Sequence, residues 1–572
     1  MITAFPYLAW RSARNRLARQ LRQLRSPRYL AALLLGFAYL WVVALQQRPQ
    51  RGPAAVQGAR WLELIGALAV AGAVLWGWIF GVERRVLSFT PAEVTFLFAG
   101  PVTRRQLVRY KLLRNQLLIL FNSLLWTLIL ARERFGTSPW LRALSIWVLL
   151  TTISFHRLGA SFVRTSLMEH GRIGLRHRVV SLGLLGVMLA AAAWSVRSAL
   201  PSLVAGWQSG ASVFLDALEG AAARPVPRVL LAPFAALVHP LAARSPAEWL
   251  HAMGPALLLL ALHYVWVIRA DTAFEEAAAE ASLRRARHLE LRGGPAARRP
   301  TQRRLPRLLR LSPVGWPGGA ILWKNLVAVL RTPRTRTTAV TLVAGGAVAG
   351  VLSLNGAGTI PEVAGWLAAT WAGLALVIGP QWIRNDLRHD LLKLDLLRSY
   401  PLPGRTIVAA EAAASALVLT SLQMGLLTVA YLAFLGDRLM TPDLPTRTAL
   451  LLLGAVCLPG VNFLGMLIQN GAALMFPAWV RLGSGRAGGV EVLGQHMLMI
   501  VAYGGALAVL LAAPGLLAAG LFELASDGLG WWAAIPAAAL LLSGIALEAA
   551  IVLRWLGRVF EATDPPGAGI AA

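Results

Sequence analysis

Long apolar runs dominate this chain of 572 residues and decide what it can fold into. Several of them contain about 20 mostly apolar residues, the length that a helix needs to cross the hydrocarbon core of a bilayer. Only 14% of the residues are charged, and the mean hydropathy is +0.61. A soluble domain carries about a quarter charged residues. The sequence therefore predicts an all-α, polytopic membrane protein.

The apolar runs predict twelve membrane-spanning helices, six in each half of the chain. They lie at residues 29–45, 62–80, 116–130, 143–162, 179–196, 253–268, 338–354, 363–380, 409–435, 449–469, 497–522 and 531–553. The segment 195–252 between the fifth and sixth helices contains several prolines, among them Pro225, Pro227, Pro233 and Pro240, and its apolar runs are short and broken. We expect it to form amphipathic or re-entrant helices at the outer face rather than a further span.

The distribution of basic residues predicts the orientation. With both termini in the cytoplasm, the cytoplasmic segments hold about 42 Lys and Arg and the external segments about 12, as the positive-inside rule requires. The net charge of +29 is therefore a topology signal, and we expect no nucleic-acid partner. The basic N-terminus lacks a small-residue cleavage site, so we read it as a membrane anchor and not as a cleaved signal peptide. We expect a multi-pass protein of the plasma (inner) membrane.

Five segments follow from this map. Residues 1–28 form a cytoplasmic amphipathic segment, 29–268 the first six-helix half, and 338–553 the second half. Between the halves, 269–337 is a basic cytoplasmic linker with a second interfacial helix, and 554–572 is a cytoplasmic tail. The linker contains about fifteen Lys and Arg, a composition typical of a solvated connector near anionic headgroups.

Three short elements occur in the same order in both halves and predict a parallel internal repeat. Trp10–Arg11 precedes the first helix, as Trp323–Lys324 precedes the seventh. A proline-led segment follows the second and the eighth helix, and Phe-Glu follows the sixth and the twelfth. All of these elements are cytoplasmic in the predicted topology. Their residues are Pro101–Val108 and Pro401–Val408 for the second element, and Phe274–Glu275 and Phe560–Glu561 for the third.

The first two elements are typical of a cytoplasmic coupling interface. Residues 7–25 place leucines beside arginines at a helical period, so this segment can lie along the membrane surface, as we also expect around Trp323 and Lys324. The proline-led segments predict short helices that enter the next span directly, because proline is favoured at a helix start. Either element could also be a simple topology anchor or a well-capped turn. The candidate interface residues are Pro101, Arg104, Arg105, Pro401, Arg405 and Glu411.

These features resemble the exporter permeases of the ATP-binding-cassette (ABC) type 2 class, in their fused, double-length form. Further segments carry the likeness: Asp271, Phe274–Glu276, Asp395–Leu402, Asn470–Val480 and Gly488–Gln495. The resemblance implies export driven by a separate ABC ATPase subunit, two copies of which would dock against residues 82–115 and 384–410. This chain contains no Gly-x-x-x-x-Gly-Lys-Ser/Thr loop to bind phosphates, so we expect ATP on the partner subunit and no cofactor on this chain.

Ionisable residues inside predicted spans are candidate functional sites, because a charge in lipid is costly. His156, Arg157, His263 and Glu548 are the ionisable candidates. Asn122, Gln423 and Asn462 are neutral polar residues at similar depth. Interhelical hydrogen bonding is the alternative role for all of them.

Catalytic chemistry is not indicated. The sequence lacks a His-Glu-x-x-His zinc motif and a Gly-x-Ser-x-Gly nucleophile motif, and its single cysteine, Cys457, lies in an apolar run. We therefore expect a transport subunit and not an enzyme. Two alternatives remain open at this point: a twelve-helix secondary transporter, which can also be built from parallel repeats, and a membrane scaffold that transports nothing.

Overall fold

The structure, a computed structural model, describes most of the predicted membrane region. The described residues are 53–79, 104–129, 138–169, 194–269, 314–356, 360–436, 442–477 and 493–563, with isolated residues between 7 and 30, between 183 and 192, and at 311 and 480. Of the described residues, 91% are helical and none lies in a strand. The all-α class is thereby confirmed.

The chain divides into two compact units. Unit 1 contains Met1–Thr301 and Gly488–His496, and unit 2 contains Gln302–Ala487 and Met497–Ala572. The division near residue 301 falls inside the predicted linker 269–337.

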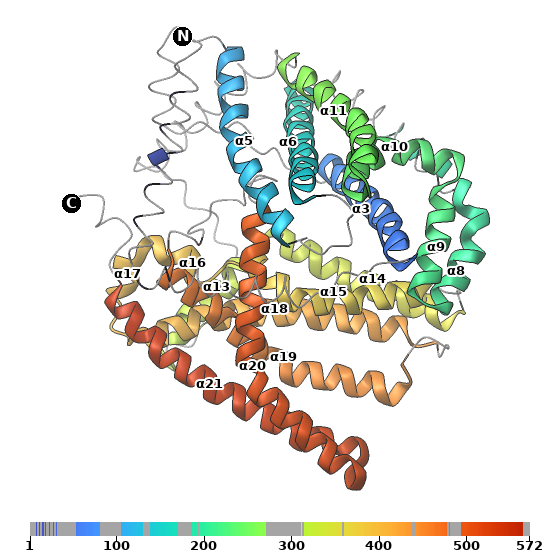
Figure 1. The fold of residues 1–572 in the computed structure, drawn as a ribbon. Helices are drawn as coiled ribbons and strands as arrows, with labels where there is room; N and C mark the ends of the chain where they lie inside the picture. Colours follow the sequence, from blue (N-terminus) through green and yellow to red (C-terminus); the bar gives the residue numbers. More distant parts are fainter. Residues whose placement is uncertain are drawn as a thin grey trace. The chain divides into compact units, whose positions relative to one another are not determined.

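In unit 1, α6 and α10 hold the other helices together. The helices are α3 (Pro53–Ile79), α5 (Arg104–Ile129), α6 (Pro139–Glu169), α8 (Leu200–Ser209), α9 (Ala211–Ala222), α10 (Pro225–Ala242) and α11 (Pro246–Arg269). α6 packs against α5, α10 and α11, while α10 also packs against α3 (Figure 1). α8 and α9 form a hairpin at Gly210, whose φ of 122° is a conformation that favours glycine.

α10 corrects the prediction for residues 195–252. We expected no run there long enough to span a membrane, yet α10 is a continuous helix of 18 residues. Pro233 and Pro240 lie inside this helix without ending it. Gly66 of α3 allows close packing against it, since a Cβ at that position would lie 2.8 Å from Val238 Cγ1. Tertiary packing against α3, α6 and α11 therefore supports a helix that its proline content argues against.

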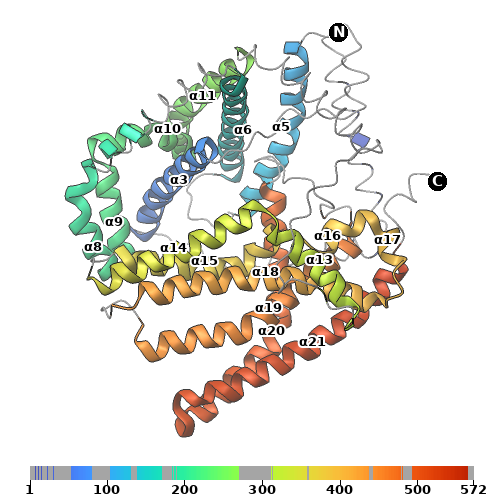
Figure 2. The same ribbon diagram turned by 180° about the vertical axis from the view of Figure 1, so that it is seen from behind.

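In unit 2, α18 is the central helix. The elements are α13 (Gly318–Leu330), α14 (Pro333–Leu354), α15 (Ile360–Trp382), α16 (Leu387–Asp390), α17 (Leu394–Arg398), α18 (Gly404–Ala433), α19 (Leu444–Met475), α20 (Leu493–Leu529, of this unit from Met497 onward) and α21 (Ala534–Ala562). α18 packs against α13, α14, α15, α19 and α21 (Figures 1 and 2). Its fully buried Leu419 fits against Gly379 of α15, where a Cβ would be only 2.5 Å from the leucine.

Nine segments among the described residues are long and apolar enough to cross a membrane. They are Pro139–Ser161, Gly186–Ser209, Pro225–Ala242, Pro246–Arg269, Thr335–Leu354, Ile360–Asp390, Gly404–Ala433, Leu444–Met475 and Met499–Ala562, the last of which contains most of α20 and all of α21. The polytopic membrane class is confirmed, whereas the count of twelve stays a prediction. The predicted helix 29–45 lies almost entirely outside the described residues.

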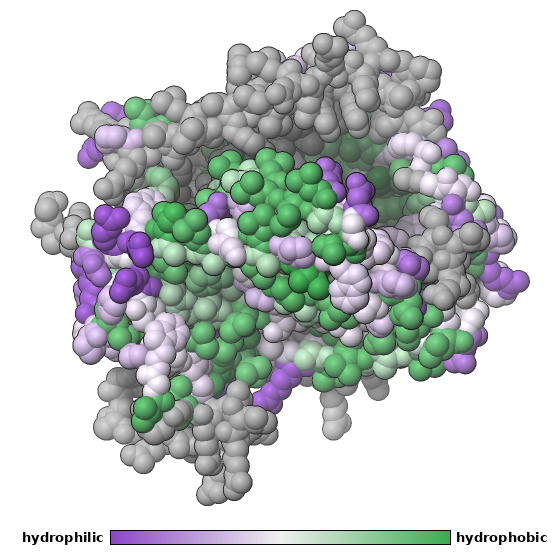
Figure 3. Space-filling model, turned by 90° about the horizontal axis from the view of Figure 1, so that it is seen from below, coloured by the Kyte–Doolittle hydropathy of each residue, from purple (hydrophilic) through white to green (hydrophobic). Residues whose placement is uncertain are grey.

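The outer surface agrees with a lipid environment. Figure 3 shows wide apolar areas on one face, with hydrophilic residues gathered mainly towards its margins. Large apolar side chains such as Leu524 (85% exposed), Leu547 (64%) and Ile551 (59%) face outward from α20 and α21. Monomeric soluble proteins rarely expose large contiguous apolar patches.

One helix end differs from the prediction. α21 continues to Ala562, although we placed residues from 554 onward in a tail. Leu556 and Phe560 are buried in the core of unit 2, which explains the extension. The proline-led segments do enter their spans directly, because α5 begins at Arg104, α18 begins at Gly404, and neither helix is interrupted.

Candidate functional site

One end of unit 2 brings together the three sequence elements predicted to repeat. α13 carries Trp323–Lys324, the first turn of α18 belongs to the proline-led segment, and the end of α21 carries Phe560–Glu561. A single buried cluster joins them, with Ile321 from α13, Ile407 from α18 and Phe560 from α21. We call this region the α13–α18–α21 junction; it also contains α16 and α17.

Lys324 ties α13 to two neighbouring elements. Its ammonium group pairs with Asp390 of α16 and lies 3.5 Å from Glu411 Oε1 of α18. Burial lowers the pKa of Lys324, but the carboxylates of Glu411 and Asp390 raise it by more, so its pKa is raised overall. On the lysine side, this stabilisation is lost as the pH rises through the raised pKa of Lys324. Because the carboxylates must be ionised to pair with the ammonium group, it is also lost when the pH falls far enough to protonate them.

Glu411 is part of this junction and not of an exposed surface. Its side chain is fully buried, and Oε2 accepts a 2.6 Å hydrogen bond from Asn325 Nδ2. We placed Glu411 among the residues that contact a partner chain, but in unit 2 it lies behind the surface and anchors α13. The sequence could not show this, because Glu411 and Lys324 are far apart in the chain.

Arg388 is an almost fully buried cation of the junction, and sequence reasoning missed it. Its guanidinium pairs with both carboxylate oxygens of Asp386, with Nε–Oδ1 at 2.8 Å and Nη2–Oδ2 at 2.6 Å. It also donates to the carbonyls of Pro380 and Ile383, each at 2.6 Å, and to Gln469 Oε1 at 3.3 Å. The last carbonyls of a helix have no partner within the helix, so Arg388 satisfies the end of α15. Asp386 in turn caps α16 through Arg388 N.

Arg398 joins α17 to the end of α21. Its guanidinium donates to the carbonyls of Phe560 at 3.0 Å, Glu561 at 2.8 Å and Thr563. In the opposite direction, Glu561 Oε1 accepts a 2.7 Å hydrogen bond from Gly404 N at the start of α18. These contacts connect the loop between α17 and α18 to the last helix of the chain.

Two glycines allow the backbones of α18 and α21 to touch. A Cβ on Gly404 would lie 2.6 Å from Gly557 O, and a Cβ on Gly557 would lie 2.7 Å from Arg405 N. No side chain fits at either position without displacing a helix. The junction therefore depends on direct contact between the two backbones.

The outer side of the junction is exposed and mixed in character. Leu396 is 54% exposed and Tyr400 is 40% exposed, and Lys393, Pro401 and Arg405 are exposed beside them in the chain. We call these five residues the 393–405 surface. Among the predicted interface residues it contains Pro401 and Arg405.

The first-half counterparts are only partly described. Pro101 and Trp10 lie outside the described residues, and Arg104 and Arg105 begin α5, their side chains not described. Arg11 is exposed and donates from Nε to Tyr7 Oη at 3.0 Å. Trp323 in the second half is partly buried. The internal repeat and the role of these residues stay predictions.

Two of the predicted membrane histidines lie in contact inside unit 1. Trp78 Nε1 lies 3.1 Å from His156 Nε2, His156 Nδ1 lies 3.2 Å from His263 Nε2, and His263 Nδ1 lies 2.7 Å from Leu259 O. An indole N–H can only donate and a carbonyl can only accept. The three contacts are all satisfied as hydrogen bonds when both imidazoles are neutral and each carries its proton on Nδ1. These hydrogen bonds join α3, α6 and α11.

The other polar membrane residues differ in their surroundings. Asn462 Nδ2 donates to Thr420 Oγ1 at 2.8 Å and to Gln423 Oε1 at 2.6 Å, which joins α18 to α19. Arg157 is partly buried. Glu548 Oε2 is buried without a hydrogen-bond partner among the described residues. Nor do the described residues contain a group of three or more His, Cys, Asp or Glu that could hold a metal ion.

Comparison with known proteins identifies a family. A family model described as "Putative ABC exporter" matches residues 2–394, which is more than half of the chain and reaches the start of α17. Neither a curated protein nor a solved structure matches the chain.

Proposed function

Because the chain belongs to this family of ABC exporters, we propose that it is the membrane permease subunit of an ATP-driven exporter, with ATP bound and hydrolysed on a separate ATPase subunit. Two ATPase copies dock on its cytoplasmic side. The protein lies in the plasma membrane with both termini in the cytoplasm, as the basic residues predict.

The observation that carries the proposal is the rigid attachment of the 393–405 surface. A surface that receives force from a motor protein must be joined firmly to the helices that move. Behind this surface, Arg398 and Glu561 bind α17 and α18 to α21. Arg388 fixes α16 to the end of α15, and Lys324 fixes α13 to α16 and α18. A displacement of this one exposed segment would therefore be transmitted to six helices, α13, α15, α16, α17, α18 and α21.

The test is purification of the tagged chain from its native host in mild detergent, with associated proteins identified and ATP hydrolysis measured. A stoichiometric ATPase partner is expected. Arg405→Glu reverses one exposed charge of the 393–405 surface, and Arg104→Glu with Arg105→Glu does the same at the predicted first-half counterpart. Each change should lower ATPase recovery at least about tenfold, as for a central interface residue.

Arg228→Glu is the matched control. Arg228 is exposed on α10, in the segment predicted to be external, so the same charge reversal should leave ATPase recovery unchanged. Equal losses for Arg228→Glu and Arg405→Glu would refute the proposed interface. A stable chain that never recovers an ATPase in several detergents would favour a secondary transporter or a scaffold, which uptake driven by an ion gradient would then distinguish.

A further inference from the structure

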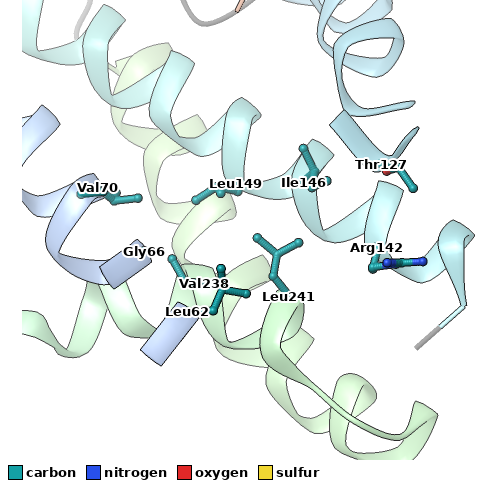
Figure 4. A pocket seen from close by; sticks show the side chains of 10 residues that line it. Leu62, Gly66, Val70, Thr127, Arg142, Ile146, Leu149, Val238 and Leu241 are labelled. Carbon is teal, nitrogen blue, oxygen red and sulfur yellow. The ribbon is translucent and has the colours of Figure 1, made fainter. Parts of the chain in front are cut away.

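Unit 1 contains an apolar cavity that no step of the proposed function uses. Its volume is about 200 Å³, and α3, α5, α6 and α10 supply its walls (Figure 4). Eight of its ten lining residues are aliphatic residues or glycine, so its surface is almost wholly apolar. Figure 4 shows Ile146 and Leu149 of α6 on one side of the lining and Val238 of α10 on the other.

The two polar residues that line the cavity are already engaged. The hydroxyl of Thr127 donates to Ser123 O at 2.8 Å, so its proton is used within α5. Arg142 is only 6% exposed and takes part in an interaction of its own. A charged or strongly polar ligand would therefore lose its hydration in this cavity without gaining a partner. The cavity suits uncharged hydrocarbon.

The contacts of α10 keep the space between α3 and α6 open. α10 touches α3 at Gly66, where a Cβ would lie 2.8 Å from Val238 Cγ1. On α6, Ser145 lies 3.4 Å from Pro240 O of α10 and accepts a 2.8 Å hydrogen bond from Trp249 Nε1 of α11. α3 and α6 are both held against α10, so neither can move in to fill the cavity without giving up these contacts.

The cavity reaches the surface of unit 1 at α3. Ala69 lines the cavity and is also exposed. Beside it on α3, Ile65 is 48% exposed and Leu68 is 38% exposed. The sequence predicts a membrane span at residues 62–80, so this exposed apolar side of α3 adjoins the hydrocarbon of the bilayer. Lipid chains are therefore the molecules that reach the opening.

From these observations we infer that the cavity binds a segment of one acyl chain of a membrane lipid, which enters past Ala69 while the headgroup stays outside. An apolar cavity of about 150 Å³ can hold a benzene ring. By proportion, this cavity holds a segment of roughly six to eight carbon atoms, and not two chains side by side. Recognition depends on shape and apolar contact, so the charge of the headgroup has no part in it.

The experiment uses the full chain in nanodiscs with a phosphatidylcholine that carries a diazirine at the end of one acyl chain. After irradiation, the labelled residues are mapped by mass spectrometry. Ile146 and Ile119 form a matched pair, because both are buried in one cluster and only Ile146 lines the cavity. Ile146 should be labelled several-fold more than Ile119. Equal labelling of the two isoleucines would overturn the proposal.

A substitution at the opening tests the site of entry. Ala69→Phe places a ring at the exposed lining position and should abolish labelling of Ile146, while exposed Leu258 of α11 is labelled as before. Ala232→Phe is the matched control, since Ala232 is exposed on α10 and does not line the cavity, and it should leave labelling of Ile146 unchanged. Labelling of Ile146 that survives Ala69→Phe, with thermal unfolding unchanged, would refute entry at α3. The comparison of Ile146 with Ile119 needs no variant.

Two further probes test what the cavity recognises. A phosphatidylglycerol with the same labelled chain should label Ile146 as strongly as the phosphatidylcholine does, and a several-fold difference would overturn recognition by hydrocarbon alone. An alkyl diazirine without a headgroup represents a free apolar molecule. Labelling of Ile146 by this probe and by neither phospholipid would refute the lipid chain. None of these measurements requires ATP or an ATPase, so their failure leaves the proposed coupling function untouched.

Discussion

Arg388 shows how a single buried charge can organise the end of a membrane helix. The guanidinium takes part in hydrogen bonds with Asp386, with the carbonyls of Pro380 and Ile383 at the end of α15 and with Gln469, and it is almost fully excluded from solvent. A buried ion pair of this kind gives limited net stability, because both charges lose their hydration. Removing one partner is different, since the other charge is then left buried and unpaired.

Arg388→Met should therefore be strongly destabilising. We expect a loss of about 3–5 kcal/mol in the free energy of unfolding. Denaturant titration of the purified protein in detergent measures it. Arg336→Met is the control, since Arg336 is exposed on α14 and its replacement should change stability by less than about 0.5 kcal/mol.

The second charge separates two explanations of that loss. Asp386→Asn combined with Arg388→Met removes both charges and keeps a side chain that can cap α16. The double variant should recover part of the stability lost in Arg388→Met. If the double variant is no more stable than Arg388→Met, the loss of stability comes from the carbonyls at the end of α15 that no longer receive hydrogen bonds from Arg388, and not from the unpaired carboxylate of Asp386.

Residue roles were only partly predictable, because the sequence shows which residues are polar but not which of them meet. His156 and His263 were recognised as unusual, yet their contact depends on how α6 and α11 pack. Lys324 and Glu411 were both chosen, for different reasons, and the structure pairs them. Asp386 and Arg388 stand at the end of an apolar run and read as ordinary loop charges. Their spacing of two residues was the sequence feature that could have indicated an ion pair.

At the scale of helices, the contact between α18 and α21 is the most demanding feature. Gly557→Val would place a side chain where a Cβ already lies 2.7 Å from Arg405 N. The end of α21 should move away, and the hydrogen bonds of Arg398 and Glu561 should break. We expect a destabilisation of about 1–3 kcal/mol and faster proteolysis near residues 399–403, both measured on the purified protein.

Gly520→Val provides the comparison on a neighbouring helix. Nothing lies within 4 Å of a Cβ built on Gly520, so valine fits there, and valine is a better helix former than glycine. Its stability and protease sensitivity should stay close to those of the unchanged protein. Similar behaviour of the two variants would mean that the glycine contact does not hold the junction together.

Helix positions were largely predictable because apolar runs of spanning length are a local property of the sequence. Within the described residues, helices occur at each predicted span, although boundaries shift by several residues. α10 was missed because its prolines suggest a broken segment, and only its neighbours show that the helix continues. The end of α21 was placed too early because Arg554 and Arg558 suggest a solvated tail.

For the whole molecule, the orientation in the membrane is the property that the basic residues predict. In a Cys457→Ala background, a cysteine at exposed Arg228 should react with an impermeant maleimide on intact cells. A cysteine at exposed Leu396 should react only after the cells are opened. The opposite labelling pattern would reverse the topology, and labelling at both sites in intact cells would mean that the alternation of spans is wrong.

The length of the last two helices has a consequence for the surrounding bilayer. α20 contains 37 residues, so a straight helix would be about 56 Å long, whereas the hydrocarbon core is about 30 Å thick. The turn between α20 and α21 begins at Gly530, whose φ is 54°, and carries Trp531 and Trp532, which are 67% and 73% exposed. Tryptophan prefers the headgroup region. Holding Trp531 and Trp532 in the headgroup region requires a tilt of the α20–α21 hairpin or a locally thicker bilayer. This hydrophobic mismatch makes the thickness of the membrane a determinant of the tilt angle of the hairpin.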